Sequence, residues 1–385
     1  MFGVDFKTVL ITAQVAGYMV SKFLGIKVVA EMPPRRWATS IVVLIAVAQI
    51  ALVGFALVPP PWNAAFLFLN GLPLGMVFGL VLRYLEGRQQ TEFLTAGLCA
   101  SFILADGAMK SLGAQLLAMG VPLDWMPAAA GLAAAPALVL FVAMLARIPA
   151  PSAADVAART VRVDMNQSQR RGLYARYAFG LSLLVGMYLL VTILRSIRAD
   201  FAPEIWLGLG VSAVPETFTY SEIVVALGVL AVNGASVLVR DNRRAFFTSL
   251  VTCSAGFVLI IAALVGQNLA VVSPFAFMVL IGLGLYVPYV AVHTTVFERL
   301  LAMTRQRGTI GFLMYVADAF GYLGYVAVML SKHLVTDGNN MLGYFVGACW
   351  VAAAFSLVGL LLAWRYFERC CPVEMPVASV SEVSA

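Results

Sequence analysis

The chain has 385 residues, of which 62% are hydrophobic and only 11% are charged. Its mean hydropathy of +0.93 lies far above that of ordinary globular domains, so composition excludes a soluble protein. The sequence has no phosphate-cradling loop, no zinc-binding helix motif and no serine-nucleophile turn, and its five cysteines lack metal-ligand spacing. We therefore expect no enzyme activity, no cofactor and no bound metal.

Long apolar stretches dominate the chain. A bilayer core about 30 Å thick needs roughly 20 apolar residues per helix. Eleven such stretches are too many for the buried helices of a soluble core, so we predict an all-α, multi-pass membrane protein whose non-protein partner is the lipid bilayer. The predicted transmembrane helices cover residues 8–29, 37–59, 63–84, 93–119, 123–147, 176–198, 218–239, 246–266, 272–296, 309–331 and 342–364.

The basic residues orient these helices. If the loop with Lys27, Arg35 and Arg36 faces the cytoplasm, 19 of the 25 Lys and Arg residues lie on the cytoplasmic side. The exceptions are Lys7, Arg198 and Lys332 on the opposite side and Lys22, Lys110 and Arg195 within helices. The positive-inside rule then predicts a bacterial inner (plasma) membrane protein with a cytoplasmic C-terminus. The net charge of +6 follows from this topology, so we expect no nucleic-acid partner.

One polar, basic connection divides the chain. It opens with a Pro-rich run and has five predicted helices before it and six after it. We predict an N-terminal bundle at 1–147, a cytoplasmic linker at 148–175, a C-terminal bundle at 176–371 and a disordered tail at 372–385.

The two bundles share a repeat. Three short patterns recur in the same order at spacings of 209 to 212 residues: Gly25–Arg36 recurs as Gly234–Arg244, Gly71–Gly75 as Gly282–Tyr286, and Ala105-Asp106 as Ala317-Asp318. Halves that repeat in this way are typical of secondary transporters, whose substrate site lies between them. At the same spacing, the helix that begins near Tyr177 would have its partner before Met1, so we expect a further first helix to be encoded upstream.

Several segments resemble a known family. The eleven helices, the central linker and the Gly, acidic, Arg-Arg loop in each half resemble the major facilitator superfamily, in which two helical bundles are related by a pseudo-twofold axis. Two segments are similar to the second and seventh helices of its organophosphate:phosphate antiporters: Tyr18-Met-Val-Ser21-Lys22-Phe23-Leu-Gly25 and Tyr188-Leu-Leu-Val-Thr-Ile-Leu-Arg195-Ser-Ile-Arg198-Ala-Asp200-Phe201-Ala-Pro203. The whole chain also resembles a bacterial facilitator-like family of unassigned function.

The resemblance implies a role for Arg195. The matching arginine of the antiporters contacts the substrate phosphate, and a guanidinium suits this role because its planar fork can hold two phosphate oxygens. The alternative is that Arg195 extends to the outer interface, as we expect Arg198 to do.

Asp106, Lys110 and Asp318 are the other predicted substrate-site residues. Asp106 and Lys110 are four residues apart and so share a helix face, where they either neutralise each other or contribute to a site. The repeat places Asp318 opposite Asp106, with Tyr322 in place of Lys110. We expect Asp318 to complete a central site with the first half's cation, Lys110.

Glu222 and His293 are candidates for proton coupling. Carboxylates and imidazoles inside membranes can carry protons, but both residues can equally be hydrogen-bonded interior groups.

The repeated loops are candidate conformational gates. We expect them to hold one face of the transporter closed through Gly25, Glu31, Arg35 and Arg36 in the first half and Gly234, Asp241, Arg243 and Arg244 in the second.

These features together predict a monomeric secondary active transporter. Its small-molecule substrate would be an organic anion, such as an organophosphate, carried by alternating access as an exchanger or with protons. The alternatives are a proton-coupled carrier of a neutral solute and a non-transporting sensor or degenerate paralogue.

Overall fold

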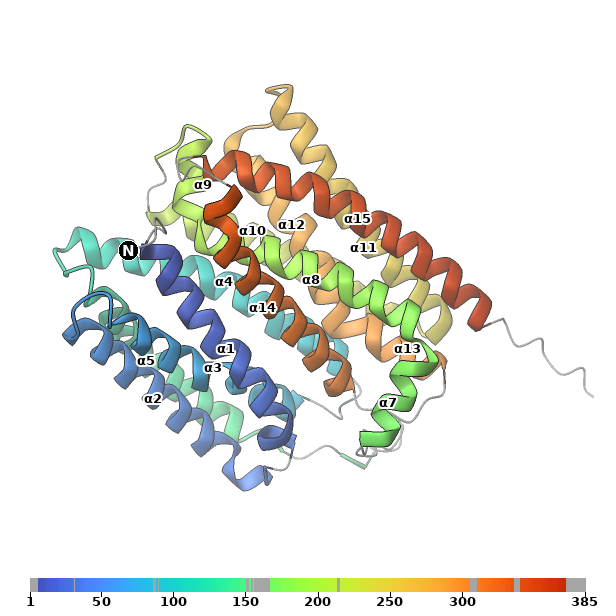
Figure 1. Ribbon diagram of the computed structural model, residues 1–385. Coiled ribbons are helices and arrows are strands. Elements are labelled where there is room, and N and C mark those ends of the chain that lie inside the picture. The colour runs from blue at the N-terminus through green and yellow to red at the C-terminus, as the bar shows by residue number, and fades with distance from the viewer. Residues whose placement is uncertain are drawn as a thin grey trace, which may run out of the picture.

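Long helices, all running in roughly the same direction or opposite to it, make up the protein (Figure 1). The computed structural model describes residues 6–30, 32–85, 88, 90–149, 152–153, 155, 167–212, 215–304, 310–335 and 340–371. Glu31 and the predicted tail at 372–385 lie outside these residues.

The first half contributes five long helices. Their bounds are α1 Phe6–Ala30, α2 Trp37–Leu57, α3 Ala64–Leu85, α4 Thr91–Ala118 and α5 Met126–Ala146, with a short 3-10 turn at Pro34–Arg36 before α2. The predicted linker contains a helix, α7, at Gln167–Arg176.

The second half begins with α8, Ala178–Asp200, and the short α9, Ala202–Gly208. The remaining helices are α10 Pro215–Gly234, α11 Asn242–Asn268, α12 Pro274–Ala291, α13 Phe297–Met303, α14 Ile310–Val335 and α15 Met341–Cys370. A π-helical segment, Val292–Val296, joins α12 to α13, so the three form one continuous run.

Every predicted transmembrane stretch is helical. Within the described residues, ten helical runs are long and apolar enough to cross a membrane. The remaining long helix, α1, is not among the ten, and it carries the polar residues Gln14, Ser21 and Lys22. Because α1 packs along both α3 and α14, these polar groups are placed inside the protein.

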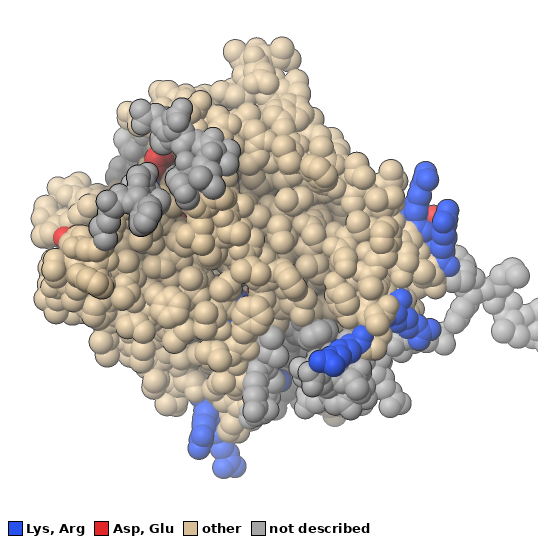
Figure 2. All heavy atoms as spheres, in the orientation of Figure 1, with Lys and Arg blue, Asp and Glu red and all other residues tan. Residues whose placement is uncertain are grey.

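Charge separates the two ends of the molecule. Arginines lie at the end of α5, before the start of α2 and at the end of α15. These three points are at the same end of the molecule, where Figure 2 shows the large groups of Lys and Arg. We call this the basic end; its described arginines include Arg35, Arg36, Arg88, Arg147, Arg176, Arg240, Arg243, Arg244, Arg299, Arg365 and Arg369. The opposite end carries Lys7, Asp124 and Glu204.

Two seams join the bundles. Helix α1 of the first half packs against α14 of the second, and α4 packs against α10 (Figure 1). The sequence repeat matches α1 with α10 and α4 with α14. The two seams are therefore counterparts of each other, as the pseudo-twofold arrangement requires.

Small residues bring the helices of the α4–α10 seam together. A Cβ atom built on Gly107 of α4 would lie 2.7 Å from the carbonyl oxygen of Phe218 and 2.8 Å from the side chain of Glu222, both on α10. Glycine therefore allows the two backbones to approach, as in other membrane helix pairs. Near the same place, the hydroxyls of Ser111 and Thr219 hydrogen-bond across the seam at 2.7 Å.

This contact yields a prediction. We expect Gly107→Ala to lower the melting temperature of the detergent-solubilised protein, because overpacking against a backbone carbonyl costs about 1–3 kcal/mol. Gly97→Ala on the same helix is the matched control, since nothing lies within 4 Å of its added Cβ atom. Alanine is the better helix former, so the control should be neutral or slightly stabilising. Equal melting temperatures for the two variants would contradict the close α4–α10 contact.

Candidate functional site

A buried ion pair crosses the α1–α14 seam. The Nζ atom of Lys22 on α1 lies 2.8 Å from a carboxylate oxygen of Asp318 on α14, and the two side chains are only 2% and 5% exposed. The ammonium also lies 5.1 Å and 5.2 Å from the ring centres of Tyr18 and Phe78. Removing two charges from water is costly, so such a pair persists only when further groups satisfy it.

The carboxylate of Asp318 has those further partners. The hydroxyl of Tyr188, on α8, donates a hydrogen bond to Oδ1 of Asp318. Nε2 of His293, in the π-helical segment, lies 3.5 Å from the same oxygen. One carboxylate therefore gathers groups from α1, α8 and the π-helical segment, which joins both bundles at a single point. π-helical turns of this kind often occur at functional sites.

His293 is oriented by its other nitrogen. Nδ1 lies 3.0 Å from the carbonyl oxygen of Tyr289, and a carbonyl can only accept, so Nδ1 must carry the hydrogen. Nε2 of the neutral ring is then a bare acceptor that faces the Asp318 carboxylate and lies 3.4 Å from the Tyr188 hydroxyl. Two acceptors face each other here, so the geometry provides a place for one additional proton.

Arg195 lies on α8 seven residues after Tyr188, among the rings of neighbouring tyrosines. Its Nη2 is 3.3 Å from the Tyr322 hydroxyl, and its guanidinium is 4.6 Å from the ring centre of Tyr289. The Nε atom is buried without a hydrogen-bond partner. Among the described residues no carboxylate lies within ion-pair distance of Arg195; the carboxylate of Asp200, which accepts a hydrogen bond from the Tyr325 hydroxyl, interacts with it electrostatically from further away.

A cluster of tyrosines connects Arg195 with Lys22. The Tyr18 ring, against Lys22, packs edge-on against the Tyr322 ring at 4.8 Å, and the Tyr322 hydroxyl meets Arg195. A second route runs through the Tyr188 and Tyr289 rings, which stack at 5.4 Å. We call this set the tyrosine cluster; its members are Tyr18, Tyr188, Tyr286, Tyr289 and Tyr322.

The sequence predicts that Arg198 extends to the outer interface, but in the structure it is buried. Its side chain is 1% exposed, and Nη2 lies 2.8 Å from Glu222 on α10 and 3.1 Å from the carbonyl oxygen of Met278. The expectation failed because a cation three residues from the end of a helix extends outward only when no buried acid faces it. Glu222 supplies that acid, so the carboxylate is held as the counterion of Arg198.

Asp106 and Lys110 form the predicted ion pair within α4. Their side chains are 29% and 24% exposed, and among the described contacts they bond only each other. The structure does not bring them to Asp318. Asp106 lies in the middle of α4, near the start of α10, whereas Asp318 lies near the start of α14 and contacts Lys22 near the end of α1. The two aspartates therefore occupy different depths, and the first-half cation that meets Asp318 is Lys22.

The predicted gate loops have local structural roles. In the second half, Asp241 caps α11 by accepting a hydrogen bond from the Arg244 backbone at 2.7 Å, and Arg243 donates to the Cys371 carbonyl oxygen. Gly234 lies against Phe93 of the first half. In the first half, Gly25 packs against Met76, and Arg35 and Arg36 are exposed. No described contact between the two loops joins them into a closed gate.

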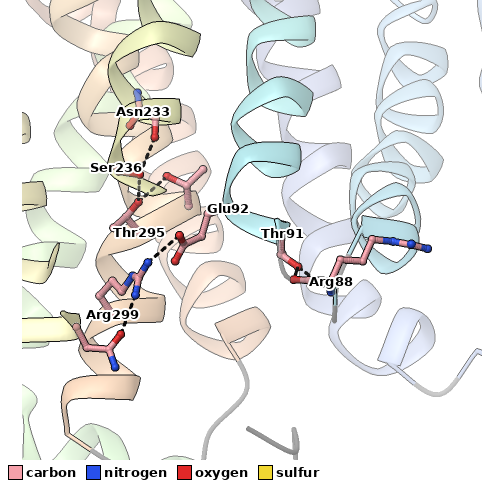
Figure 3. A network of polar contacts seen from close by, with 9 residues as sticks. Arg88, Thr91, Glu92, Asn233, Ser236, Thr295 and Arg299 are labelled. Carbon is pink, nitrogen blue, oxygen red and sulfur yellow. Dashed lines mark hydrogen bonds and ion pairs between the residues drawn. The ribbon is translucent and has the colours of Figure 1, made fainter. Parts of the chain in front are cut away.

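A different network crosses between the bundles at the basic end (Figure 3). Nη2 of Arg299, on α13, lies 2.9 Å from a carboxylate oxygen of Glu92 at the start of α4. The same guanidinium donates to Asn242 Oδ1, at the start of α11, at 2.8 Å. Beside it, Ser236 bonds both Thr295 and the backbone of Asn233. This contact was not predicted from the sequence. The signals for it were Glu92 just before a predicted helix and Arg299 just after a long apolar run.

No group of acidic, histidine and cysteine residues that could hold a metal ion occurs in the described part of the chain. The described side chains of the site are the cations Lys22 and Arg195, the carboxylate of Asp318, the imidazole of His293 and the phenols of the tyrosine cluster.

The chain as a whole matches a known family. A model described as "Family of unknown function (DUF5690)" matches residues 1–370. The chain belongs to this family. No curated protein sequence matches it.

Solved structures identify the fold of this family member. The chain is similar to the human organic anion transporter MFSD10 (TETRAN), with a TM-score of 0.57 at 14% identity over 93% of this chain and 83% of that one. It is also similar to a D-xylose-proton symporter, with a TM-score of 0.60 at 12% identity over 94% and 89% of the two chains. A third structure, the major facilitator superfamily proton:xylose symporter XylE bound to 6-bromo-6-deoxy-D-glucose, gives 0.56 at 13% identity over 93% and 84%. The fold is that of the major facilitator superfamily, as predicted.

The ion pair between the bundles can be tested by unfolding. We expect Lys22→Met to lower the free energy of unfolding by about 3–5 kcal/mol, because Asp318 would remain buried without its cation. Lys22→Met combined with Asp318→Asn should be milder, since both charges are gone. The measurement is reversible unfolding of the purified protein in mixed detergent micelles, followed by circular dichroism.

The partly exposed pair on α4 provides the control. Asp106→Asn should cost less than Lys22→Met, because both members of its pair are partly exposed rather than fully buried. A double variant at Lys22 and Asp318 that is as unstable as the worse single variant would mean that the pair does more for stability than cancel charge.

Proposed function

We propose that this protein is a secondary active transporter for a small organic anion, and that Arg195 binds the anionic group of the substrate. The observation that carries the proposal is the state of Arg195. Its guanidinium lies between the bundles among tyrosine rings. Among the described residues its buried Nε atom has no hydrogen-bond partner, and no carboxylate lies within ion-pair distance.

An uncompensated cation in this position is expensive to maintain. Charged groups inside a membrane protein face a partner or a water-filled pathway, and they usually mark the route of a substrate or ion. The neighbouring Arg198 illustrates the structural alternative, because a buried carboxylate neutralises it. Arg195 lacks such a partner, so an anionic ligand is the group that would complete its environment.

The surrounding tyrosines favour an organic anion. Their hydroxyls can bond oxygens of a phosphate or carboxylate, and their rings can cover the carbon skeleton. The resemblance of the segment around Arg195 to the organophosphate antiporters makes a phosphate ester our preferred substrate, taken up by exchange or with protons. A structurally similar protein is an organic anion transporter, which is consistent with this class.

Two described contacts join the bundles, one at each end of the molecule, and each would have to break when the transporter opens to that side. Glu92–Arg299 ties them at the basic end, and Lys7–Glu204 ties α1 to α9 at the opposite end. We propose that these two contacts alternate, with the repeated loops around Arg36 and Arg244 supporting the closed basic end. By the positive-inside rule this end, with the C-terminus, faces the cytoplasm of a bacterial inner membrane. We propose that one chain forms a complete, monomeric carrier.

Arg195 gives the direct test. In proteoliposomes that contain the purified protein, we expect counterflow of labelled glycerol 3-phosphate, a hexose 6-phosphate or succinate. Arg195→Lys should reduce it at least about tenfold, because a point charge cannot reproduce the two-oxygen grip of a guanidinium. Reconstitution yield should not change.

Arg147→Lys, at an exposed position on the basic end, is the matched control and should transport like the wild type. Wild-type rates in Arg195→Lys would contradict the assignment of Arg195. Transport of xylose that does not depend on Arg195 would instead favour a carrier of neutral solutes, and no transport of any compound would favour a sensor or degenerate paralogue.

A further inference from the structure

Ion pairs leave Arg195 without a directly bonded carboxylate among the described residues. Lys22 pairs with Asp318 and Arg198 pairs with Glu222, whereas Asp200, which acts on Arg195 electrostatically, accepts its hydrogen bond from the Tyr325 hydroxyl. With His293 neutral, the centre formed by Lys22, Asp318 and Arg195 therefore carries one net positive charge when it is empty. One bound monoanion would make it neutral.

Lys22 is placed to act on the same ligand as Arg195. The ammonium lies against one ring of the Tyr18–Tyr322 pair, and the guanidinium meets the hydroxyl of the other. If Lys22 were released from Asp318, two cations would face the same tyrosines. Two cations suit a ligand with two negative charges, such as a phosphate monoester or a dicarboxylate.

A proton on Asp318 would release Lys22 while the carboxyl group itself keeps its hydrogen bonds; the freed ammonium would then need the ligand as its partner. The protonated carboxyl can donate to His293 Nε2, which is a bare acceptor because Nδ1 is bonded to the Tyr289 carbonyl oxygen. The Tyr188 hydroxyl can continue to donate to the carboxyl. The site is thus built to hold Asp318 in either charge state, which most buried carboxylates are not.

We propose that Asp318, supported by His293, is a proton-binding site, and that its protonation frees Lys22 to join Arg195 in binding a dianion. The protein would then carry one dianionic phosphate monoester or dicarboxylate together with one proton. This inference rests on the proposed function, because it assumes that Arg195 binds the anion.

Charge balance gives the proposal its specificity. Two free cations, a neutral Asp318 and a dianion sum to zero, so the loaded centre is neutral. A dianion without the proton would leave one negative charge in the membrane interior, where an unbalanced charge costs several kcal/mol. A monoanion reaches neutrality with Asp318 ionised and needs no proton.

Other titratable groups around Asp318 are compatible with this role. Among the described residues, those that face it or interact with it electrostatically are Lys22 on α1, Cys99 on α4, Tyr188 on α8, Tyr289 on α12, His293 in the π-helical segment and Tyr322 on α14 itself. Lys22 is the only cation of this set at ion-pair distance, so it is the group whose freedom depends on the charge of Asp318.

The experiment uses proteoliposomes and two probes of fixed charge. Between pH 7.5 and 8.5 glycerol 3-phosphate is a dianion, since its second proton leaves at about pH 6, and its methyl diester is a monoanion. An inward proton gradient, with pH 7.5 outside and pH 8.5 inside, should raise steady-state accumulation of the monoester about tenfold at most, the size of the gradient, and at least severalfold. It should leave accumulation of the diester unchanged.

Variants separate the proton site from the anion site. Asp318→Asn should lose accumulation of the monoester by the gradient, because its amide cannot take up the proton, and Lys22→Met should weaken transport of the monoester more than transport of the diester. Asp124→Asn, an exposed carboxylate at the opposite end, is the control and should respond like the wild type. If Asp318→Asn fails to fold, the comparison of the two probes in the wild type decides alone.

The possible failures are distinguishable. If counterflow depends on Arg195 but both probes respond equally to the gradient, or if Asp318→Asn still accumulates the monoester, the proton site is wrong and the anion site stands. If neither probe shows counterflow that depends on Arg195, the anion site is wrong, and this inference falls with it.

Discussion

The buried ion pair between Lys22 and Asp318 is the interaction on which the arrangement of this protein depends. A lysine near the end of α1 and an aspartate near the start of α14 can each be buried only if they meet. Their meeting sets the rotation of α1 and α14 about their own axes. It also brings the π-helical segment and α8 to the same carboxylate, through His293 and Tyr188. The seam that joins the bundles and the site between them are therefore one structure.

The two seams are topological counterparts but chemically different. The α1–α14 seam depends on a charge pair, whereas the α4–α10 seam depends on Gly107 and on the hydroxyls of Ser111 and Thr219. A glycine contact against a backbone carbonyl does not change with protonation, so that seam can serve as a fixed pivot. A charge pair with a proton acceptor beside it can change, which makes the other seam the natural place for a switch. The two seams thus share their helix positions in the repeat while their contacts differ in kind.

Sequence patterns predicted the fold well and the site only in part. Apolar runs, basic loops and the repeat are spread along the chain, and each reports directly on helix length, orientation or pairing. The sequence repeat matches Asp318 with Asp106 and therefore predicted Lys110 as the first-half cation beside Asp318, which was wrong. A one-dimensional match cannot give the depth of a residue along its helix, and that depth decided in favour of Lys22. Arg198 was misplaced because Glu222 lies on another helix. The spacing of Tyr286, Tyr289 and His293, at three and four residues, was the available signal that these rings share a helix face.

The remaining positive charge of Arg195 links the structure to its mechanism. A helix bundle that rearranges around an unbalanced charge must carry that charge through a region of low polarity, whereas a neutral centre meets no such barrier. In the proposed mechanism, the empty centre of Lys22, Asp318 and Arg195 has one excess cation, which a bound anion would remove. Movement between the two faces should therefore be easier with substrate than without it, so that this fold would run exchange faster than net uptake. Proton binding at Asp318 extends the same rule to a dianion, because each added negative charge is matched by releasing a cation that the protein already holds.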